Sequence, residues 1–357
     1  MHLSDFDFDL PSELIAQAPV FPRDTSRLIF GTKDRKIEHG IFSDIKKVFK
    51  KGDVLVLNDT KVIPALLHAR KQNCEGNSIT INLVKKIQNS DLLWQILAKP
   101  AKKLALGDIL YFDEGGEFKA EVVYKESANN EIYIKFLMVS EAQIFHNLER
   151  YGMMPLPQYI KRNILSSKAT DNEAYQTEYA RELGSFAAPT AGLHFTTKLL
   201  QEIRDIGVEI VFVTLHVGLG TFLPIKTDDI NTHRMHTESF SISDDTASAI
   251  NMAKKRGSKV ICIGTTTLRA LESSADAIGM VMPTHSSETD IFIKPGYEFR
   301  VVDSLVTNFH LPKSTLFVLV SAFTSLEFMG ILYSEAISNS YRFFSYGDAC
   351  YIERFCS

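Results

Sequence analysis

Four segments that read as β-strands are each followed at once by a cluster of polar residues and glycines. Ligands usually bind at the carboxyl ends of the strands in an open α/β sheet, so four such clusters indicate one shared polar site. A single cluster would be ordinary turn chemistry, because Gly, Asn and Thr are common turn residues. The clusters begin at Asn58, His216, Gly264 and Asn308, and they contain the candidate site residues Asp59, Gly218, Gly220, Thr265, Thr266, Arg269 and His310.

The cluster GTTTLRALES, which begins at Gly264, reads as a glycine followed by the start of a helix. Gly264 lets the backbone approach a ligand closely, and the free N–H groups at a helix start favour an anion or another polar group. We therefore expect Thr265, Thr266 and Arg269 to hold a ligand. The alternative is a plain helix cap beside a surface arginine.

The stretch FAAPTAGLHFT, residues 186–196, places His194 at the end of a tight loop before a predicted helix. Pro189 makes the chain arrive extended, and Gly192 can adopt conformations that other residues resist. We predict a shallow polar cradle in which Thr190 and Gly192 contact a ligand. His194 would take part in proton transfer or orient the group that does. The alternative is a tight turn with a buried structural histidine.

The stretch HRMHTE contains His233, His236 and Glu238, a spacing that permits metal binding. Without a defined third ligand this signal is weak, and we favour acid–base or hydrogen-bonding roles for His236 and Glu238. The stretch HVGLGTF has G-x-G but lacks the third glycine of a dinucleotide-binding loop. The sequence also lacks a phosphate-binding Walker loop and a G-x-S-x-G nucleophile elbow.

The chain has 357 residues, of which 45% are apolar, and a net charge of -4. It is not basic overall, so any contact with nucleic acid must come from a local patch. The four cysteines do not suggest a disulfide framework, and neither a signal peptide nor a membrane span is evident. We therefore expect a cytoplasmic protein without membrane contact. The basic clusters are Lys46, Lys47, Lys50, Lys51, then Lys102, Lys103, then Lys254, Lys255 and Arg256.

The hydrophobic pattern changes between residues 66 and 137, where the sequence lacks helical periodicity and reads as short strands separated by turns. This predicts a small antiparallel barrel or sandwich. Ser140 then begins a capping-box pattern for a helix that Gly152 ends. From residue 185 helices and strands alternate, and residues 289–302 look like two strands around a Pro-Gly turn. We predict an α/β class: an α/β domain of residues 1–63 and 139–357, interrupted by a β-barrel domain of residues 64–138.

Taken together, the motifs resemble the S-adenosylmethionine:tRNA ribosyltransferase-isomerase family of queuosine biosynthesis. The segments that carry the resemblance are LNDTKVIPA, AAPTAGLHFT, VTLHVGLGTF, HRMHTE, GTTTLRALES, TDIFIKPGYEFRVVDSLVTNFHLPKSTL and YRFFSYGDA. They span nearly the whole chain. The resemblance implies that the ribosyl part of S-adenosylmethionine moves to 7-aminomethyl-7-deazaguanine in the wobble position of a tRNA. Epoxyqueuosine forms, and adenine and methionine leave. S-adenosylmethionine is then a substrate, and we expect no cofactor, no metal and a monomer.

The implied chemistry needs a base for the carbon beside the sulfonium, an acid for the leaving adenine, and donors for the ribose hydroxyls. We expect His194 and Asp59 nearest the chemistry, with the sequence leaving open which group is base and which is acid. Two rivals are a metal-dependent nucleoside hydrolase using His233 and His236, and a non-catalytic RNA-binding protein. The resemblance and the clusters together give as catalytic candidates Asp59, His194, His216, His236 and Glu238, and as substrate-binding candidates Thr190, Gly192, Gly218, Gly220, Thr265, Thr266, Arg269, Asp290, Asn308 and His310.

Overall fold

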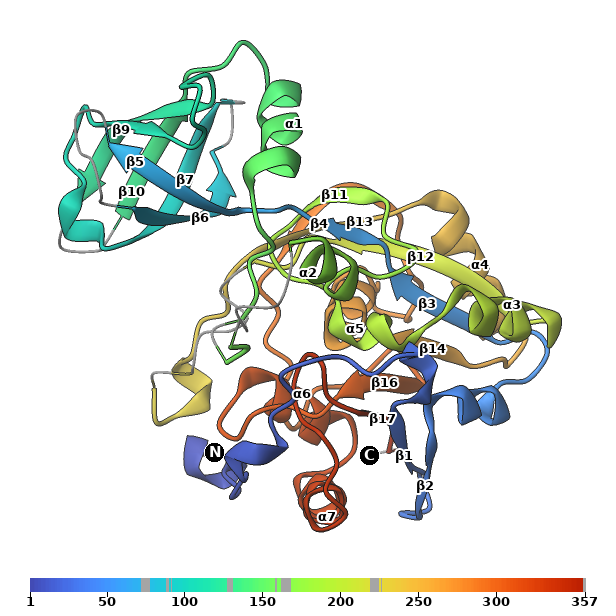
Figure 1. Cartoon of the computed structure of the whole chain (residues 1–357). Coiled ribbons are helices and arrows are strands. Elements are labelled where there is room, and N and C mark those ends of the chain that lie inside the picture. The colour runs from blue at the N-terminus through green and yellow to red at the C-terminus, as the bar shows by residue number, and fades with distance from the viewer. Residues whose placement is uncertain are drawn as a thin grey trace.

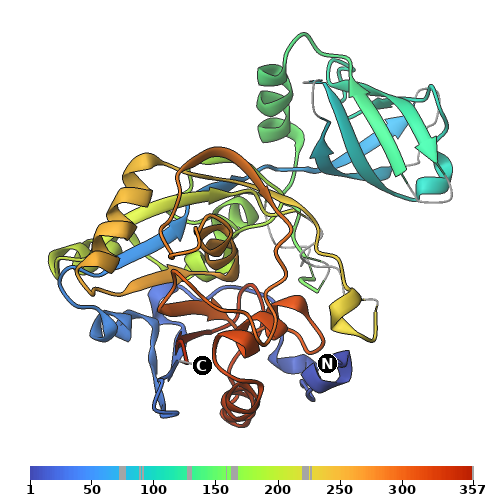
Figure 2. The ribbon, with the colours of Figure 1, turned by 180° about the vertical axis from the view of Figure 1, so that it is seen from behind.

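A computed structural model describes residues 1–71, 78–87, 90, 92–126, 131–157, 159–161, 168–218, 225 and 227–355. The chain forms a large domain around a central sheet and a closed β-barrel that lies to one side of it (Figure 1). The α/β class with an inserted antiparallel barrel is confirmed. Seen from behind, the barrel is joined to the large domain by the chain entering it and by the helix that follows it (Figure 2).

The barrel consists of strands that pair only in antiparallel fashion, in the order β10-β7-β6-β5-β8-β9. Alternate residues of β6 point inward, so Ile79, Ile81 and Leu83 are buried in an apolar core of their own. A short 3-10 turn, η5, is the only helical element among the described residues between the first and last barrel strands. The bounds are β5 (Leu66–Lys71), β6 (Ile79–Lys86), β7 (Leu93–Lys99), η5 (Ala101–Lys103), β8 (Ile109–Tyr111), β9 (Lys119–Glu126) and β10 (Glu131–Phe136).

The helix after the barrel, α1 (Glu141–Tyr151), begins and ends where the sequence predicts. The Ser140 hydroxyl accepts a hydrogen bond from the backbone N–H of Gln143. The α1 side chains Ile144 and Leu148 pack into the barrel core, although α1 follows the expected boundary at residue 138. The chain then hydrogen-bonds back to the segment entering the barrel, through the N–H and carbonyl groups of Leu66 and Met153. The segment that enters the barrel and the segment that leaves it therefore lie side by side. The exact domain boundaries, at residues 63/64 and 138/139, stay a prediction.

The central sheet has nine strands in the order β15-β13-β12-β3-β14-β16-β17-β1-β2. Strands β12, β3, β14 and β16 are neighbours and run parallel, so their carboxyl ends share one edge. Strand β17 runs antiparallel to β16 and parallel to β1, so β1 and β17 begin at that same edge. The bounds are β1 (Arg27–Gly31), β2 (Ile37–Ile41), β3 (Val54–Asn58), β12 (Glu209–Leu215), β13 (Glu238–Ile242), β14 (Val260–Ile263), β15 (Thr284–Thr289), β16 (Ser304–Asn308) and β17 (Ala349–Glu353).

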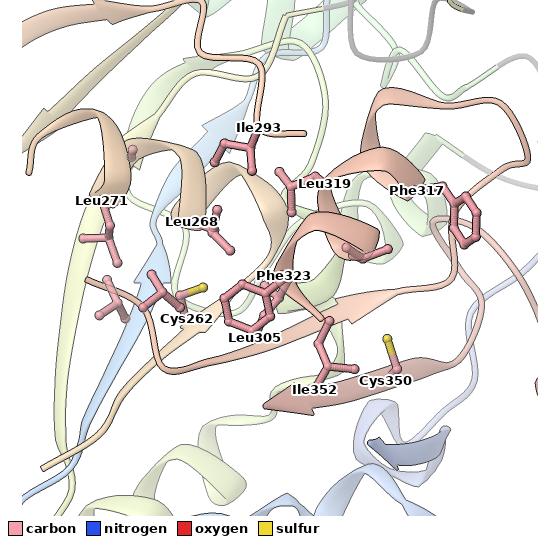
Figure 3. Packing of buried hydrophobic residues seen from close by; sticks show 14 of the residues in the cluster. Cys262, Leu268, Leu271, Ile293, Leu305, Phe317, Leu319, Phe323, Cys350 and Ile352 are labelled. Carbon is pink, nitrogen blue, oxygen red and sulfur yellow. The ribbon is translucent and has the colours of Figure 1, made fainter. Parts of the chain in front are cut away.

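Helices cover both faces of this sheet, because the strands bury alternate residues on each side. One face packs against η4 (Phe42–Val48) and α3 (Thr197–Asp205). The other packs against α4 to α7, and Figure 3 shows Leu268 and Leu271 of α5 and Phe323 of α6 over that core. The bounds are α4 (Asp244–Lys255), α5 (Thr265–Ser273), α6 (Thr315–Phe323) and α7 (Leu326–Ser338).

Smaller elements link these layers. The parallel pair β4 (Thr60–Val62) and β11 (Glu182–Ser185) leads from β3 toward the barrel. In the part of the chain that the structure describes, no single helix is long and apolar enough to cross a membrane; only α6 and α7 together reach the length, and they bend by 114°. The remaining elements are α2 (Lys168–Ala174) and the 3-10 turns η1 (Leu3–Phe6), η2 (Ser12–Leu14), η3 (Arg23–Thr25), η6 (Thr190–His194) and η8 (Ile230–Thr232).

The expected strand pair at residues 289–302 is wrong. The segment after β15 is irregular until β16 begins. Its backbone N–H groups are bound by a side chain instead of a neighbouring strand: the buried Glu272 carboxylate accepts from the N–H groups of Val301 and Val302, both at 3.1 Å. A carboxylate that satisfies several backbone donors removes the need for a sheet partner. The apolar, β-branched pattern of the segment reflects burial against α5.

Candidate functional site

The predicted convergence of the four polar clusters is confirmed by the strand order, which places the ends of β12, β3, β14 and β16 side by side. Asn58 ties the first two together. Its Oδ1 accepts from the N–H of Leu215 at 3.1 Å, and its Nδ2 donates to the carbonyl of Leu215 at 3.0 Å. Nδ2 also lies 3.5 Å from the hydroxyl of Thr266 at the start of α5. A buried side chain bonded this fully holds the edge of the sheet rigid.

His194 is buried at this edge, with both ring nitrogens hydrogen-bonded. Nδ1 lies 2.7 Å from the hydroxyl of Ser26, and Nε2 lies 3.1 Å from Nδ2 of Asn308. The amide Nδ2 is a donor, so Nε2 accepts and Nδ1 carries the proton. Thr190 donates to Oδ1 of Asn308 at 2.9 Å, which completes a chain of bonds from the loop to the end of β16. The ring of His194 also stacks on Phe42, with centroids 4.7 Å apart.

Burial lowers the pKa of His194 from 6.5 to about 4, because a charged imidazole would lose its hydration; the carboxylate of Asp348 opposes this in part. The ring is therefore neutral near neutral pH. A neutral ring with both nitrogens engaged is held in one orientation and one tautomer. It can orient Asn308 and pass a proton only when one of its two partners moves.

The loop around Gly192 differs from its predicted conformation. Gly192 does not adopt a left-handed backbone; instead a side chain there would collide with a neighbour, since a Cβ would lie 2.0 Å from the hydroxyl of Tyr179. The N–H groups at the start of α3 do not face a ligand either. Thr197 N–H donates to the Glu178 carboxylate, and the Thr196 hydroxyl caps Leu199. The glycine is required for close packing.

Asp59 follows β3 and is 4% exposed. Its Oδ1 accepts from the hydroxyl of Thr214 at 2.7 Å, and its Oδ2 accepts from Nη2 of Arg181 at 2.9 Å. The guanidinium of Arg181 also lies over the ring of Phe212, 4.3 Å from its centroid. Arg181 itself is more than half exposed, so Asp59 is a buried carboxylate whose partner is a cation held at the surface.

His216 lies at the end of β12, beside Asp59. Its Nδ1 is 2.8 Å from the hydroxyl of Thr60, and its ring packs closely on Gly184, where a Cβ would lie 2.6 Å from Cε1. Burial lowers the pKa of His216, while the carboxylates of Glu182 and Asp59 act in the opposite direction. Unlike His194, this ring lines an open groove of about 670 Å³, and within the described part of the chain it has one hydrogen bond, at Nδ1. It is the better-placed proton acceptor of the two.

Glu238 and Arg269 form a buried ion pair, in which 4% of the surface of Glu238 and 2% of that of Arg269 is exposed. The second carboxylate oxygen of Glu238 accepts from the N–H of Gly218 at 3.1 Å. Arg269 Nε donates to the carbonyl of Ile291 at 3.2 Å, and its buried Nη2 has no partner among the residues that the structure describes. Buried polar groups are normally bonded, so a free N–H pair on a buried guanidinium indicates a place for an acceptor. Gly220, predicted in the same loop as Gly218, lies outside the described residues.

The start of α5 lies against the loop that carries His194. Gly264 has φ +86°, a left-handed conformation, and a Cβ there would lie 3.7 Å from Cβ of Ala191. A glycine is required here because other residues resist this conformation. No side chain caps the helix, and Thr265 and Thr266 begin it. Side chains in a helix lean toward its N-terminus, so Arg269 extends over the turn that contains these two threonines.

The structure does not bring every candidate to this edge. His310 is buried between two hydroxyl groups. Its Nε2 lies 3.1 Å from the hydroxyl of Thr307, and its Nδ1 lies 3.4 Å from the hydroxyl of Tyr333 in α7. Burial lowers the pKa of His310 to about 3. Neighbouring residues of a strand point to opposite faces, so Thr307 and its partner His310 lie on the far side of the sheet from the Asn308 side chain. Asp290, by contrast, does lie at this edge, because it follows β15, whose last residue Thr289 pairs with Glu238; it is exposed there.

The metal reading of HRMHTE finds no support in the described part of the chain. His236 is exposed and His233 half-buried, whereas Glu238 is buried in its pair with Arg269. Within that part no group of three His, Cys, Asp or Glu side chains could hold a metal ion. His233 packs edge-on against Phe292, and burial lowers its pKa.

Several residues of the site gave no usable signal in the sequence. Ser26 and Thr214 are lone hydroxyl residues whose partners are distant in sequence, and Arg181 is one of many charged residues. Asp348 lies in the motif YRFFSYGDA, in which the sequence alone points to no role for a single residue. Its buried carboxylate accepts from the N–H groups of Arg27 at 3.1 Å and Arg342 at 2.9 Å, and so fixes the start of β1 beside His194.

Comparison with known proteins agrees with this architecture. Residues 3–352 match the family model described as queuosine biosynthesis protein. The S-adenosylmethionine:tRNA ribosyltransferase-isomerase of Desulforamulus reducens is 47% identical, over 99% of this chain and 100% of that protein. The protein of the same name from Geotalea uraniireducens is 48% identical, with the same coverage.

A solved structure is also similar: the crystal structure of S-adenosylmethionine tRNA ribosyltransferase from Thermotoga maritima. It is 34% identical, with a TM-score of 0.53, and the match covers 98% of this chain and 99% of that one. The match thus includes both the central sheet and the barrel. The chain therefore belongs to the queuosine biosynthesis protein family, a family of S-adenosylmethionine:tRNA ribosyltransferase-isomerases.

Proposed function

We propose that this enzyme transfers the ribosyl group of S-adenosylmethionine to 7-aminomethyl-7-deazaguanine at the wobble position of a tRNA and isomerises it to give epoxyqueuosine. Adenine and methionine leave, so S-adenosylmethionine is a substrate, and we expect neither a cofactor nor a metal. The observation that carries the proposal is full-length similarity, at 47% and 48% identity, to relatives named for this reaction. We place the reaction at the carboxyl edge of the central sheet.

His216 is the proposed base. The carbon beside the sulfonium must lose a proton, and a neutral imidazole is a suitable acceptor. The lowered pKa keeps His216 neutral, Thr60 fixes the ring through Nδ1, and the ring lines the open groove. Asp59, at the end of the neighbouring strand, supplies negative charge near the sulfonium. His194, which the sequence places near the chemistry without assigning it as base or acid, is the poorer base because both of its nitrogens are occupied.

His194, Thr190 and Asn308 are the proposed orienting group. Their chain of hydrogen bonds fixes the Asn308 amide at the edge where β16 ends. An amide held in one orientation offers one donor and one acceptor, which suits the ribose hydroxyls or the edge of the target base. His194 then acts through Asn308. This is the second of the two roles that the sequence allows.

Arg269 and the start of α5 are the proposed anchor for the methionine end of S-adenosylmethionine. The buried, unpartnered Nη2 of Arg269 and the uncapped N-terminus of α5 both favour a carboxylate. Glu238 holds the guanidinium and the backbone of Gly218 in place. We therefore give Glu238 a positioning role, in place of the proton transfer suggested by its motif.

The tRNA contact is proposed to rest on a local patch, since the net charge is -4. Lys46 and Lys47 form ion pairs with Glu202 and Asp44. The candidates for the patch are two pairs chosen for their exposure: Lys50 with Lys51, and Lys102 with Lys103. Charge reversal of the contacting pair should weaken tRNA binding and reduce the salt slope by about one unit per lost phosphate contact. Unchanged affinity in both double variants would place the patch elsewhere.

We further propose that the enzyme is a monomer that acts in the cytoplasm. The reaction is tested by incubating the purified full chain with S-adenosylmethionine and tRNA that carries the aminomethyl base. Mass spectrometry of the digested tRNA should show epoxyqueuosine, formed in equal amount with adenine. Product-free tRNA under conditions where both substrates bind would refute the proposed reaction. Light scattering of the same sample tests the monomer.

A further inference from the structure

A groove of about 670 Å³ is lined by residues 209–212 and 214 of β12, together with residues of β11, β13 and the start of α4. These elements are labelled in Figure 1. The volume of the groove lies in the range of small-molecule binding sites, about 300–1,000 Å³. One end contains Asp59, Thr214 and His216 from the carboxyl edge of the sheet, so the groove is continuous with the proposed site. It continues along the strand past Phe212 to Glu209.

The charge of the groove selects the class of ligand. Its described lining includes four carboxylates, those of Asp59, Glu182, Glu209 and Asp245, against one guanidinium, that of Arg181. His216 is neutral, because burial lowers its pKa. A lining that is negatively charged on balance repels phosphate groups and attracts a cation. The sugar–phosphate backbone of the tRNA is therefore a poor occupant.

The position of Arg181 marks where such a cation would lie. Its guanidinium sits between the Asp59 carboxylate, at 2.9 Å, and the ring of Phe212, whose centroid is 4.3 Å away. A carboxylate and an aromatic face together recognise onium cations. The Asp59 carboxylate is 6% exposed and is oriented by Thr214, whereas the Arg181 side chain is 58% exposed. The two groups that would bind a cation, the Asp59 carboxylate and the Phe212 ring, thus belong to the sheet, whereas the Arg181 guanidinium that now lies between them belongs to an exposed side chain.

We infer that this groove receives the positively charged sulfonium end of S-adenosylmethionine, and that Arg181 occupies the cation position until the substrate displaces it. The inference rests on the proposed function, which makes S-adenosylmethionine a substrate. It also explains how product leaves: methionine carries a neutral thioether, so the groove loses its attraction for the sulfur once the sulfonium is consumed. His216, in the same groove, then lies on the side from which the carbon beside the sulfur is deprotonated.

The test is the affinity of the full chain for S-adenosylmethionine and for S-adenosylhomocysteine, its neutral thioether, measured by calorimetry without tRNA. The wild type should prefer the sulfonium. Asp59→Asn keeps the shape and removes the charge, so it should weaken S-adenosylmethionine binding about tenfold or more and leave S-adenosylhomocysteine nearly unchanged. Arg181→Gln should tighten S-adenosylmethionine binding severalfold, because the competing cation is gone.

The exposed pair Arg35–Glu327, joined at 2.9 Å on the far side of the domain from the groove lining, provides matched controls. Arg35→Gln and Glu327→Gln should leave both affinities at the wild-type values. Should Asp59→Asn misfold, as judged by its melting temperature, Thr214→Val serves instead. It removes the hydroxyl that orients the carboxylate and should reduce the preference for the sulfonium in the same direction.

Three results would overturn the inference. In the first, Asp59→Asn changes both affinities equally or neither. In the second, Arg181→Gln weakens S-adenosylmethionine binding as Asp59→Asn does, which would make Arg181 part of the binding site. In the third, Asp59→Asn keeps the sulfonium preference but loses the preference for tRNA with the aminomethyl base over tRNA with guanine. The groove would then bind the ammonium of the target base. Adenine release by the wild type is measured in a separate assay. A failure of the proposed reaction can therefore be told apart from a failure of the proposed sulfonium site.

Discussion

Asn308 Nδ2 lies 3.1 Å from Nε2 of His194 and joins the end of β16 to the loop before α3. Ser26 holds the other ring nitrogen from the start of β1. Three segments that are distant in sequence are therefore fixed to each other through one imidazole ring. The bond gives His194 its place in the site: it sets the orientation of the Asn308 amide.

Replacing His194 by Ala should reduce kcat by about 10²-fold or more while tRNA affinity is kept, because the Asn308 amide loses its fixed orientation. Asn308→Asp should lose a comparable factor, and the double variant little more than either, since the two residues act as one unit. His39→Ala is a matched control, because His39 is also bonded at both nitrogens, to Tyr341 and Glu335, away from the site. Near wild-type turnover of a folded His194→Ala enzyme would make this ring purely structural.

Glu238→Ala should destabilise the fold by about 3–5 kcal/mol, because it leaves the buried Arg269 guanidinium without its counter-charge. Glu202→Ala removes a partner of Lys46 in a pair whose side chains are 38% and 34% exposed, and should destabilise the fold much less. Urea denaturation of both variants measures the difference. Equal costs for the two would show that the buried pair adds no stability of its own.

The buried histidines predict loss of stability in acid. Burial lowers the pKa of His194 from 6.5 to about 4 and that of His310 from 6.5 to about 3. The unfolded chain therefore takes up protons first as pH falls below 6.5. The free energy of unfolding should be highest above pH 6.5 and should decrease as pH falls toward 4. The slope should be smaller in His194→Gln, and an identical slope in the two proteins would contradict the burial argument.

Gly192→Ala should destabilise the protein by about 1–3 kcal/mol, because the new Cβ collides with the Tyr179 hydroxyl at 2.0 Å. Tyr179→Phe removes that oxygen and should recover part of the loss in the double variant. Gly330→Ala, in α7 with nothing within 4 Å of the new Cβ, is the control and should not destabilise. If the Tyr179→Phe background recovered no stability, the close contact would not be the reason for the glycine.

The meeting of the polar clusters after β3, β12, β14 and β16 could be predicted from the sequence, because parallel strands present their carboxyl ends at one edge of the sheet. Long-range partners could not. Ser26 precedes His194 by 168 residues, and no spacing rule connects them. The strands expected at residues 289–302 failed because Glu272 binds the backbone N–H groups there. His310 belongs to a strand-end cluster, yet alternation along β16 directs its partners to the other face.

The most direct test of the account is the rate of adenine release from S-adenosylmethionine in the presence of tRNA carrying the aminomethyl base, for the wild type and for His216→Asn. The variant keeps a nitrogen near the Thr60 hydroxyl but removes the proton acceptor in the groove. We predict adenine release by the wild type, and a rate lower by about 10²–10⁴-fold in the variant, with S-adenosylmethionine affinity kept. A His216→Asn enzyme that releases adenine at the wild-type rate would contradict the account.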